Sequence, residues 1–214
     1  MNTSPGTLGQ MRAPTRKHHS TDALAPICDI NEQCLQMLVE AAHVPPTASE
    51  PFILQLLALI ATLDAATLST AARFPFLLVD FGFRDPEWWN EITAASELDS
   101  REETWPSPFP RAAAIALARA TLMLAWHTVR TDTEASVVLL GITPAVARIL
   151  RSRRLQDIDR IAEQHHARIR PRWEDRPGVW RQLMFCAKST EVDAAHDFVL
   201  HALQLTASAA LPKA

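Results

Sequence analysis

The longest apolar stretch of the chain, residues 111–129, has the spacing of one α-helix with apolar side chains around much of its circumference. Such a helix must be covered by other elements or by a second copy of the chain, because water would otherwise meet a wide apolar surface. We therefore predict that it lies at the centre of the fold or in a homo-oligomer interface. The expected interface residues are Ile115, Leu122 and Trp126.

The composition favours an all-α fold. Of the 214 residues 48% are hydrophobic, only 5 are glycine and none is tyrosine. Alanine, the strongest helix former, is abundant, whereas the residues that favour strands are sparse. We predict a helical bundle for the whole chain.

Three segments are expected to lack a core of their own. Residues 1–25 mix Ser, Thr, Pro and basic side chains with few apolar ones, which predicts a disordered basic tail. Residues 96–110 hold three prolines and four acids, which predicts a Pro-rich linker. At the other end, residues 206–214 are expected to be a frayed tail.

The linker separates two predicted helical domains of opposite charge, one over residues 26–95 and one over residues 111–205. Residues 25–110 carry 3 basic and 13 acidic side chains, whereas residues 111–188 carry 14 basic and 7 acidic ones. The positive second half would be drawn toward a polyanion such as DNA, or the two halves would attract each other.

In the N-terminal half, the apolar periodicity predicts helices over residues 30–42 and 50–73. Residues 74–83 form an aromatic run that fits either an extended segment or a helix. Asp85 followed by Pro86 predicts an N-cap and the first position of a further helix. We expect the aromatic side chains to pack in the core rather than to bind a ligand.

Residues 132–168 have the order helix, tight turn, short helix, turn and longer helix, which is typical of a helix-turn-helix. Asp132 is the expected cap of the first helix and Gly141 its end, while Thr143 is expected to cap the second. Leu155 is expected to begin the third. The same periodicity fits a generic pair of packed helices, so the predicted unit is helix-turn-helix-like.

Arginines crowd the turn between the last two of these helices and continue along the third. A guanidinium is always charged and donates hydrogen bonds in pairs, which suits phosphate oxygens. The predicted DNA-binding residues are Arg148, Arg151, Arg153, Arg154, Arg160 and Arg168. We refer to the first four of them as the elbow arginines.

Two acids in the first turn of the third helix, Asp157 and Asp159, bear on how DNA would be bound. Carboxylates there would repel the DNA backbone, unless they only complement the helix dipole. We therefore expect the elbow arginines to contact the backbone and not to read bases, with base reading through Arg160 as the alternative.

The sequence has no motif of catalysis or cofactor binding. The few glycines form neither GxxxxGK nor GxGxxG, and HExxH, CxxC and GxSxG are absent. Cys28 and Cys34 lie six residues apart, and His165 and His166 would point about 100° apart on a helix, so neither pair is expected to hold a metal ion. We expect no enzyme, no cofactor and no metal site.

The expected location is the cytoplasm. The basic N-terminus is not followed by the apolar region of a signal peptide. Residues 52–63 and 112–126 are apolar but shorter than the roughly 20 residues that span a membrane. The odd number of cysteines, three, fits a reducing compartment.

Several short motifs follow one another in residues 122–187. They are Leu122-Met123-Leu124-Ala125-Trp126, Thr131-Asp132-Thr133-Glu134-Ala135, Leu139-Leu140-Gly141-Ile142, Ile161-Ala162-Glu163, Arg172-Trp173-Glu174-Asp175-Arg176 and Trp180-Arg181-Gln182-Leu183. Their order and spacing resemble the FlhD subunit of the flagellar master transcriptional activator. The resemblance implies an all-helical, oligomeric subunit that activates transcription jointly with a FlhC-type partner, with relatives that regulate conjugative elements.

The chain also departs from that family pattern. Residues 1–110 have no counterpart in it, and Arg153 and Arg154 make the elbow more basic than a FlhD-type subunit would be. A mobile or conjugative element is therefore the expected context rather than a flagellum.

Together these observations predict a DNA-binding transcriptional regulator subunit that acts as a homo-oligomer with a FlhC-like partner. The alternative is a helical assembly or scaffold protein without DNA contact, and an enzyme is the least favoured class. The regulator predicts a DNA affinity that falls steeply with salt, and the scaffold predicts oligomers that are indifferent to DNA.

Overall fold

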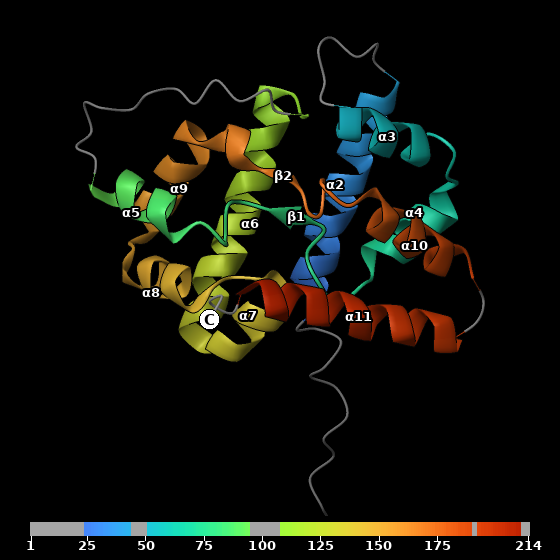
Figure 1. Ribbon diagram of the computed structural model, residues 1–214. Helices are drawn as coiled ribbons and strands as arrows, with labels where there is room; N and C mark the ends of the chain where they lie inside the picture. The colour runs from blue at the N-terminus through green and yellow to red at the C-terminus, as the bar shows by residue number, and fades with distance from the viewer. Residues whose placement is uncertain (1–23, 44–50, 95–107, 190–191, 211–214) are drawn as a thin grey trace, which may run out of the picture.

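A computed structural model describes residues 24–43, 51–94, 108–189 and 192–210 of the chain. These residues form a helical bundle with one small sheet, which confirms the predicted all-α class (Figure 1). The helices are α2 (Ala25–Ala42), α3 (Pro51–Ile60), α4 (Ala65–Ala72), α5 (Pro86–Ala94), α6 (Arg111–Thr131), α7 (Thr133–Leu140), α8 (Pro144–Ser152), α9 (Leu155–Gln164), η1 (His166–Arg168), α10 (Pro177–Lys188) and α11 (Val192–Ala210). The strands β1 (Val79–Asp80) and β2 (Arg170–Pro171) pair antiparallel, with Val79 opposite Pro171.

The predicted tails and linker fall largely outside the described residues. Of the expected tail over residues 1–25, only residues 24 and 25 are described, and of the expected linker over residues 96–110, only residues 108–110. At the other end α11 runs on to Ala210, so residues 206–210 are helical although the sequence predicts them to be frayed.

Helix α6 lies at the centre of the bundle, as its apolar pattern predicts. It packs against α2, α7, α8 and α9, and Figure 1 shows α5, α8 and α9 on one side of it and α2, α3, α4 and α10 on the other. Within the described part of the chain, α6 alone is a single helix long and apolar enough to cross a membrane by length and composition. Its packing against these helices is that of a core helix.

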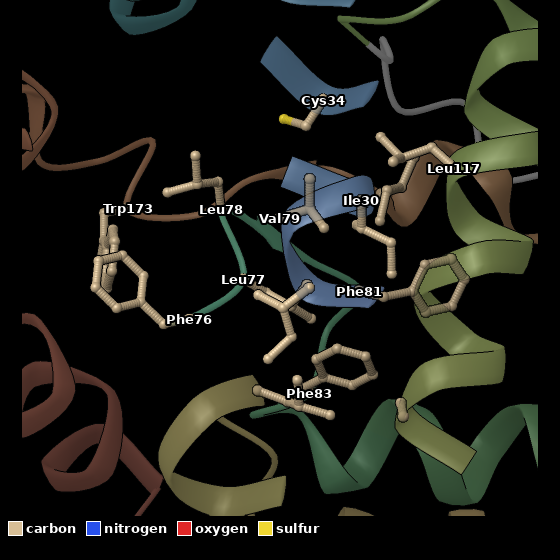
Figure 2. Close-up of a cluster of buried hydrophobic side chains, with 14 of the residues drawn as sticks. Ile30, Cys34, Phe76, Leu77, Leu78, Val79, Phe81, Phe83, Leu117 and Trp173 are labelled. Atoms are coloured by element: carbon tan, nitrogen blue, oxygen red, sulfur yellow. The ribbon is translucent and has the colours of Figure 1, made fainter. Parts of the chain in front are cut away.

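In the described residues the two halves of the chain contribute to one hydrophobic core, and their division into two helical domains stays a prediction. The aromatic run after α4 is extended: it contributes β1 and crosses the middle of the fold between α2 and α6 (Figure 2). Phe76, in this run, contacts Trp173 with ring centroids 5.6 Å apart and Phe198 of α11 at 6.3 Å. Because all three rings are buried, the aromatic cluster is packing, as predicted.

A single buried amide holds the extended run in place. The Nδ2 of Asn31 donates to the carbonyl oxygens of Ala72 at 3.2 Å, Phe74 at 3.4 Å and Phe76 at 2.9 Å. Its Oδ1 accepts from the backbone N–H of Leu78 at 2.8 Å. Asn31 is fully buried, so it supplies the partners that this stretch of backbone lacks inside the core.

The predicted helix over residues 50–73 is wrong, because the structure has two helices there. Helices α3 and α4 meet at a bend of 116°. Asp64 begins α4 as its N-cap, with a carboxylate oxygen that accepts from the N–H of Thr67 at 2.7 Å. The predicted cap at Asp85 is confirmed, since its side chain accepts from the N–H of Trp88 at 3.0 Å at the start of α5.

Candidate nucleic-acid interface

The caps predicted around the interface are present. Asp132 accepts from the N–H of Ala135 at 2.9 Å and begins α7. Gly141 ends α7 with a φ of 70°, the left-handed conformation that glycine adopts without cost. Thr143 then accepts from the N–H of Val146 at 3.3 Å and begins α8. Local sequence therefore positions α8 within one residue of its expected start.

Helices α8 and α9 meet at the elbow, but each packs mainly on α6 rather than on the other. The side chains that they bury are Val146, Ala147 and Leu150 on α8, and Ile158, Ile161 and Ala162 on α9. The helices of the predicted unit thus occur in the expected order, and both α8 and α9 pack on α6. The helix-turn-helix-like function of the unit stays a prediction.

Two side chains of α6 hold the elbow. The indole Nε1 of Trp126 donates to the carbonyl oxygen of Arg153 at 2.9 Å. One turn later, Arg130 donates to the carbonyl of Arg151 at 3.2 Å, and Arg151 donates back to the carbonyl of Arg130 at 3.4 Å. The Arg130 guanidinium also lies over the Trp126 ring, 4.7 Å from its centroid. Arg130 is therefore a fifth cation at this corner.

Arg130 is not among the site residues that the sequence predicts. Trp126 and Arg130 are four residues apart on one helix, a spacing that places both side chains on the same face. This four-residue spacing is the sequence feature that could have indicated that Arg130 lies beside Trp126. The sequence contained no signal that this face of α6 meets the backbone of residues 151–153.

The elbow arginines share one property: none of them forms an ion pair with any described residue. Arg148, Arg151 and Arg154 are exposed, and Arg153 is half-buried. Arg130, which is exposed, also forms no ion pair with a described residue. The corner therefore carries positive charge that no neighbouring carboxylate neutralises, which is the electrostatic pattern of a phosphate-binding surface.

The other two predicted DNA-binding residues are placed differently. Arg160 forms an ion pair with Asp157, three residues earlier on α9, at 3.3 Å. Arg168, in η1, pairs with Asp85 at 3.3 Å, and its guanidinium lies 4.4 Å from the ring centroid of Trp88. Arg160 and Arg168 thus have acidic partners among the described residues, which the elbow arginines lack.

The two acids in the first turn of α9 are both engaged within the protein. Asp157 accepts from the backbone N–H of Arg154 at 3.0 Å and so closes the start of the helix. Asp159 pairs with Arg119 of α6 at 2.8 Å, and Glu163 pairs with the same arginine at 2.7 Å. The geometry therefore favours the capping interpretation of these acids, and their charges have local partners.

The three expected interface residues do not form one exposed face. Leu122 is fully buried in the core of its own chain, so its assignment to an interface is wrong. Ile115 and Trp126 are half-buried, and Trp126 serves the elbow. Helix α2, from the N-terminal half, packs on α6 within the same chain. A role of Ile115 and Trp126 in an oligomer interface stays a prediction.

Large exposed apolar side chains occur singly on other helices of the described part. They are Leu54, Val138, Leu155, Phe185 and Leu200. Among the described residues, no group of three or more His, Cys, Asp and Glu side chains could hold a metal ion. The three cysteines are free thiols, and two of them, Cys34 and Cys186, are buried.

The part of the chain that carries this interface resembles a known family. Residues 111–208 match the family model described as flagellar transcriptional activator (FlhD). The match confirms the resemblance seen over residues 122–187 and extends it to the whole of α6 and most of α11. The chain matches no curated protein and no solved structure. The acidic N-terminal half lies outside the match.

Proposed function

We propose that this FlhD-like chain is a DNA-binding subunit of a transcriptional activator and that its elbow arginines bind the phosphate backbone. The family match supports a transcriptional activator. The observation that carries the DNA assignment is the cluster of the elbow arginines and Arg130 without ion-pair partners among the described residues. We assign the chain no enzymatic activity.

The geometry favours binding to the backbone over reading of bases. The exposed elbow arginines project from the end of α8 and the turn after it, where a guanidinium can reach a phosphate without a helix entering a groove. On α9, Arg160 already pairs with Asp157, so its charge is partly neutralised. Contacts of this kind position a protein on DNA, and sequence recognition would come from a partner.

The partner that we propose is a FlhC-like protein, in a cytoplasmic complex that also contains further copies of this chain. The family resemblance supports this arrangement. Exposed apolar side chains on the matched part, such as Leu155 at the start of α9 and Phe185 on α10, are available for such contacts. The expected context is gene regulation on a mobile or conjugative element.

The test is the salt dependence of DNA binding, measured by fluorescence anisotropy with a promoter fragment in the presence and absence of the FlhC-like partner. Each phosphate contact contributes about 0.9 to the slope of log affinity against log salt. A variant with all four elbow arginines replaced by alanine should therefore lose up to about 3.6 units of slope. Its circular dichroism should stay unchanged, because these side chains are outside the core.

Matched controls are Arg73→Ala and Arg181→Ala, which remove exposed arginines from α4's end and from α10. Both should keep the slope of the unmodified protein. An unchanged slope in the fourfold variant would remove the elbow from the DNA interface. Stable oligomers without DNA affinity under all conditions would support the scaffold alternative.

Arg160→Ala separates backbone binding from base reading. Because Arg160 pairs with Asp157, its loss should change the salt slope less than Arg151→Ala does. A change in preference among DNA sequences, with an unchanged slope, would instead indicate that α9 reads bases.

A further inference from the structure

A cavity of about 300 Å³ opens beside the β1–β2 pair, where the two halves of the chain meet. Five arginines line it, and they come from the turn after β1 and from the segment that contains η1 and β2. They are Arg84, Arg168, Arg170, Arg172 and Arg176. The acidic side chains in its wall number only three, namely Asp80, Glu174 and Asp175. The lining therefore carries an excess of positive charge.

Two of these arginines are paired with acids of the lining. Arg170 lies 2.6 Å from Glu174, and Arg176 lies 3.7 Å from Asp175. Arg168 pairs with Asp85, at 3.3 Å. The two lining arginines outside these ion pairs are Arg84 and Arg172.

Arg84 and Arg172 form no ion pair with any described residue. Arg84 is half-buried at the edge of the cavity, and Arg172 is only 2% exposed behind its wall. The guanidinium of Arg172 donates to the carbonyl of Leu140, while its Nε and Nη1 have no acceptor among the described residues. A buried guanidinium without a carboxylate partner is costly, because it has lost its hydration.

Two charges of the cavity wall act on Arg172 in opposite directions, and the effect of Asp80 is larger than that of Arg84. Burial lowers the pKa of Arg172, Asp80 acts in the opposite direction, and Arg84 lowers the pKa further. The Arg172 guanidinium itself lies against the carbonyl of Leu140 and beside Gly141, which do not line the cavity, so Arg172 acts there as a buried charge and not as a contact for a ligand. An anion bound in the cavity beside Arg84 would offset the unpaired positive charge of the two arginines and would stabilise the folded state.

We infer that this cavity binds a small ligand through a phosphate group, with Arg84 as the direct contact and Arg172 as the buried charge behind it. A guanidinium fork matches phosphate oxygens in geometry, and a cavity of about 300 Å³ is at the lower end of the range for small-molecule sites. A phosphate could also come from DNA. The small ligand is favoured because duplex phosphates lie on a convex surface, whereas this site is recessed.

The test uses inorganic phosphate as the probe, at constant ionic strength set with sodium chloride. Thermal unfolding and titration calorimetry are measured on the full chain and on two variants. Arg84→Gln removes the contact, and Arg181→Gln removes an exposed arginine of α10 that does not line the cavity. Phosphate should raise the melting temperature of the unmodified chain and of Arg181→Gln, and Arg84→Gln should bind at least tenfold more weakly.

An equal effect of phosphate on all three proteins would overturn the proposal, because it would show a general effect of the salt. The absence of binding to the unmodified chain would overturn it as well. Arg84→Lys keeps the charge but not the fork, and it should bind with intermediate affinity. Its melting temperature without phosphate shows whether the site tolerates substitution.

A second arm distinguishes the source of the phosphate. Adenosine monophosphate and a DNA duplex are compared as competitors at equal phosphate concentration. The monophosphate should displace inorganic phosphate, and the duplex should not. Displacement by the duplex alone would overturn the small-ligand assignment and would place the cavity in the DNA interface. Neither result depends on the elbow arginines, so this proposal and the proposed function can fail separately.

Discussion

The indole Nε1 of Trp126 donates a hydrogen bond of 2.9 Å to the backbone carbonyl of Arg153. This bond joins the middle helix of the bundle, α6, to the turn that carries the arginines. It fixes the backbone of the turn and leaves the guanidinium of Arg153 to other partners. The position of the candidate interface therefore depends on a side chain that itself carries no charge.

Trp126→Phe should loosen the elbow while it keeps an aromatic ring in place. The free energy of unfolding should fall by about 1 kcal/mol, the usual net contribution of one such hydrogen bond. DNA affinity should fall too, with an unchanged salt slope, since no arginine is lost. Urea unfolding and anisotropy measure the two effects, and His127→Ala, an exposed neighbour on α6, serves as the control. Equal stability of Trp126→Phe and the unmodified chain would contradict the role of the bond.

Leu122→Asp should unfold the chain and not merely dissociate an oligomer. Leu122 is 0% exposed, so the substitution buries an unpaired carboxylate. Leu155→Asp is the matched change at a leucine that is 46% exposed, and it should leave the fold intact. Circular dichroism with light scattering distinguishes the two results. A folded, monomeric Leu122→Asp protein would restore Leu122 to the interface.

Gly141→Ala should destabilise the chain by about 2 kcal/mol, because a left-handed residue with a Cβ costs about 1–2 kcal/mol. Its φ is 70°, and an added Cβ would lie 3.1 Å from Thr206 and 3.2 Å from Arg172. Gly178, in α10, has no heavy atom within 4 Å of an added Cβ, so Gly178→Ala should be neutral or slightly stabilising. Denaturant unfolding of both variants tests the difference. Equal stabilities would show that the turn after α7 relaxes freely.

The buried thiol of Cys34 should make stability depend on pH in the alkaline range. Burial raises the pKa of Cys34 far above its ordinary 9.0. The unfolded chain loses this proton above about pH 9 and the folded chain does not, so stability is full below that pH and declines as the pH rises. Between pH 8 and pH 10 the contribution should be about 1.4 kcal/mol.

Cys34→Ala should remove this part of the pH dependence, whatever its effect on stability at pH 8. Chemical unfolding at the two pH values measures the difference. In the native protein Cys34 should also resist thiol reagents that label it after unfolding in urea, because the thiolate is the reactive form. Rapid labelling of native Cys34 would contradict its burial.

Several features of this protein follow from local sequence alone. The caps at Asp85, Asp132 and Thr143 were predictable, as was the end of α7 at Gly141. Each depends on a side chain or a backbone conformation within a few residues of the helix end, so no distant contact is needed. The apolar periodicity of α6 likewise showed that this helix had to be covered, and short collinear motifs identified the FlhD-like part.

Local sequence patterns could not show which residues cover α6. We left open whether other parts of the chain or a second copy would cover it; in the structure α2 packs against α6, and the amide of Asn31 on α2 holds the extended run. Asn31 and Phe76 are 45 residues apart in the sequence. The spacing of apolar residues within one helix cannot predict a contact between residues so far apart. The break between α3 and α4 was missed for a related reason, since an apolar helix pattern continues across it.

The sequence by itself determined that the chain is helical, that α6 has to be covered and that arginines crowd one turn. Tertiary structure alone decided which of those arginines keep an uncompensated charge. Arg168 looks like Arg151 in sequence, but Asp85 from the N-terminal half pairs with it, and Arg130 joins the elbow from another helix. The pair of Arg160 with Asp157, by contrast, is local to α9. The reason is physical: ion pairs require carboxylates within about 4 Å, and that distance depends on how the helices pack.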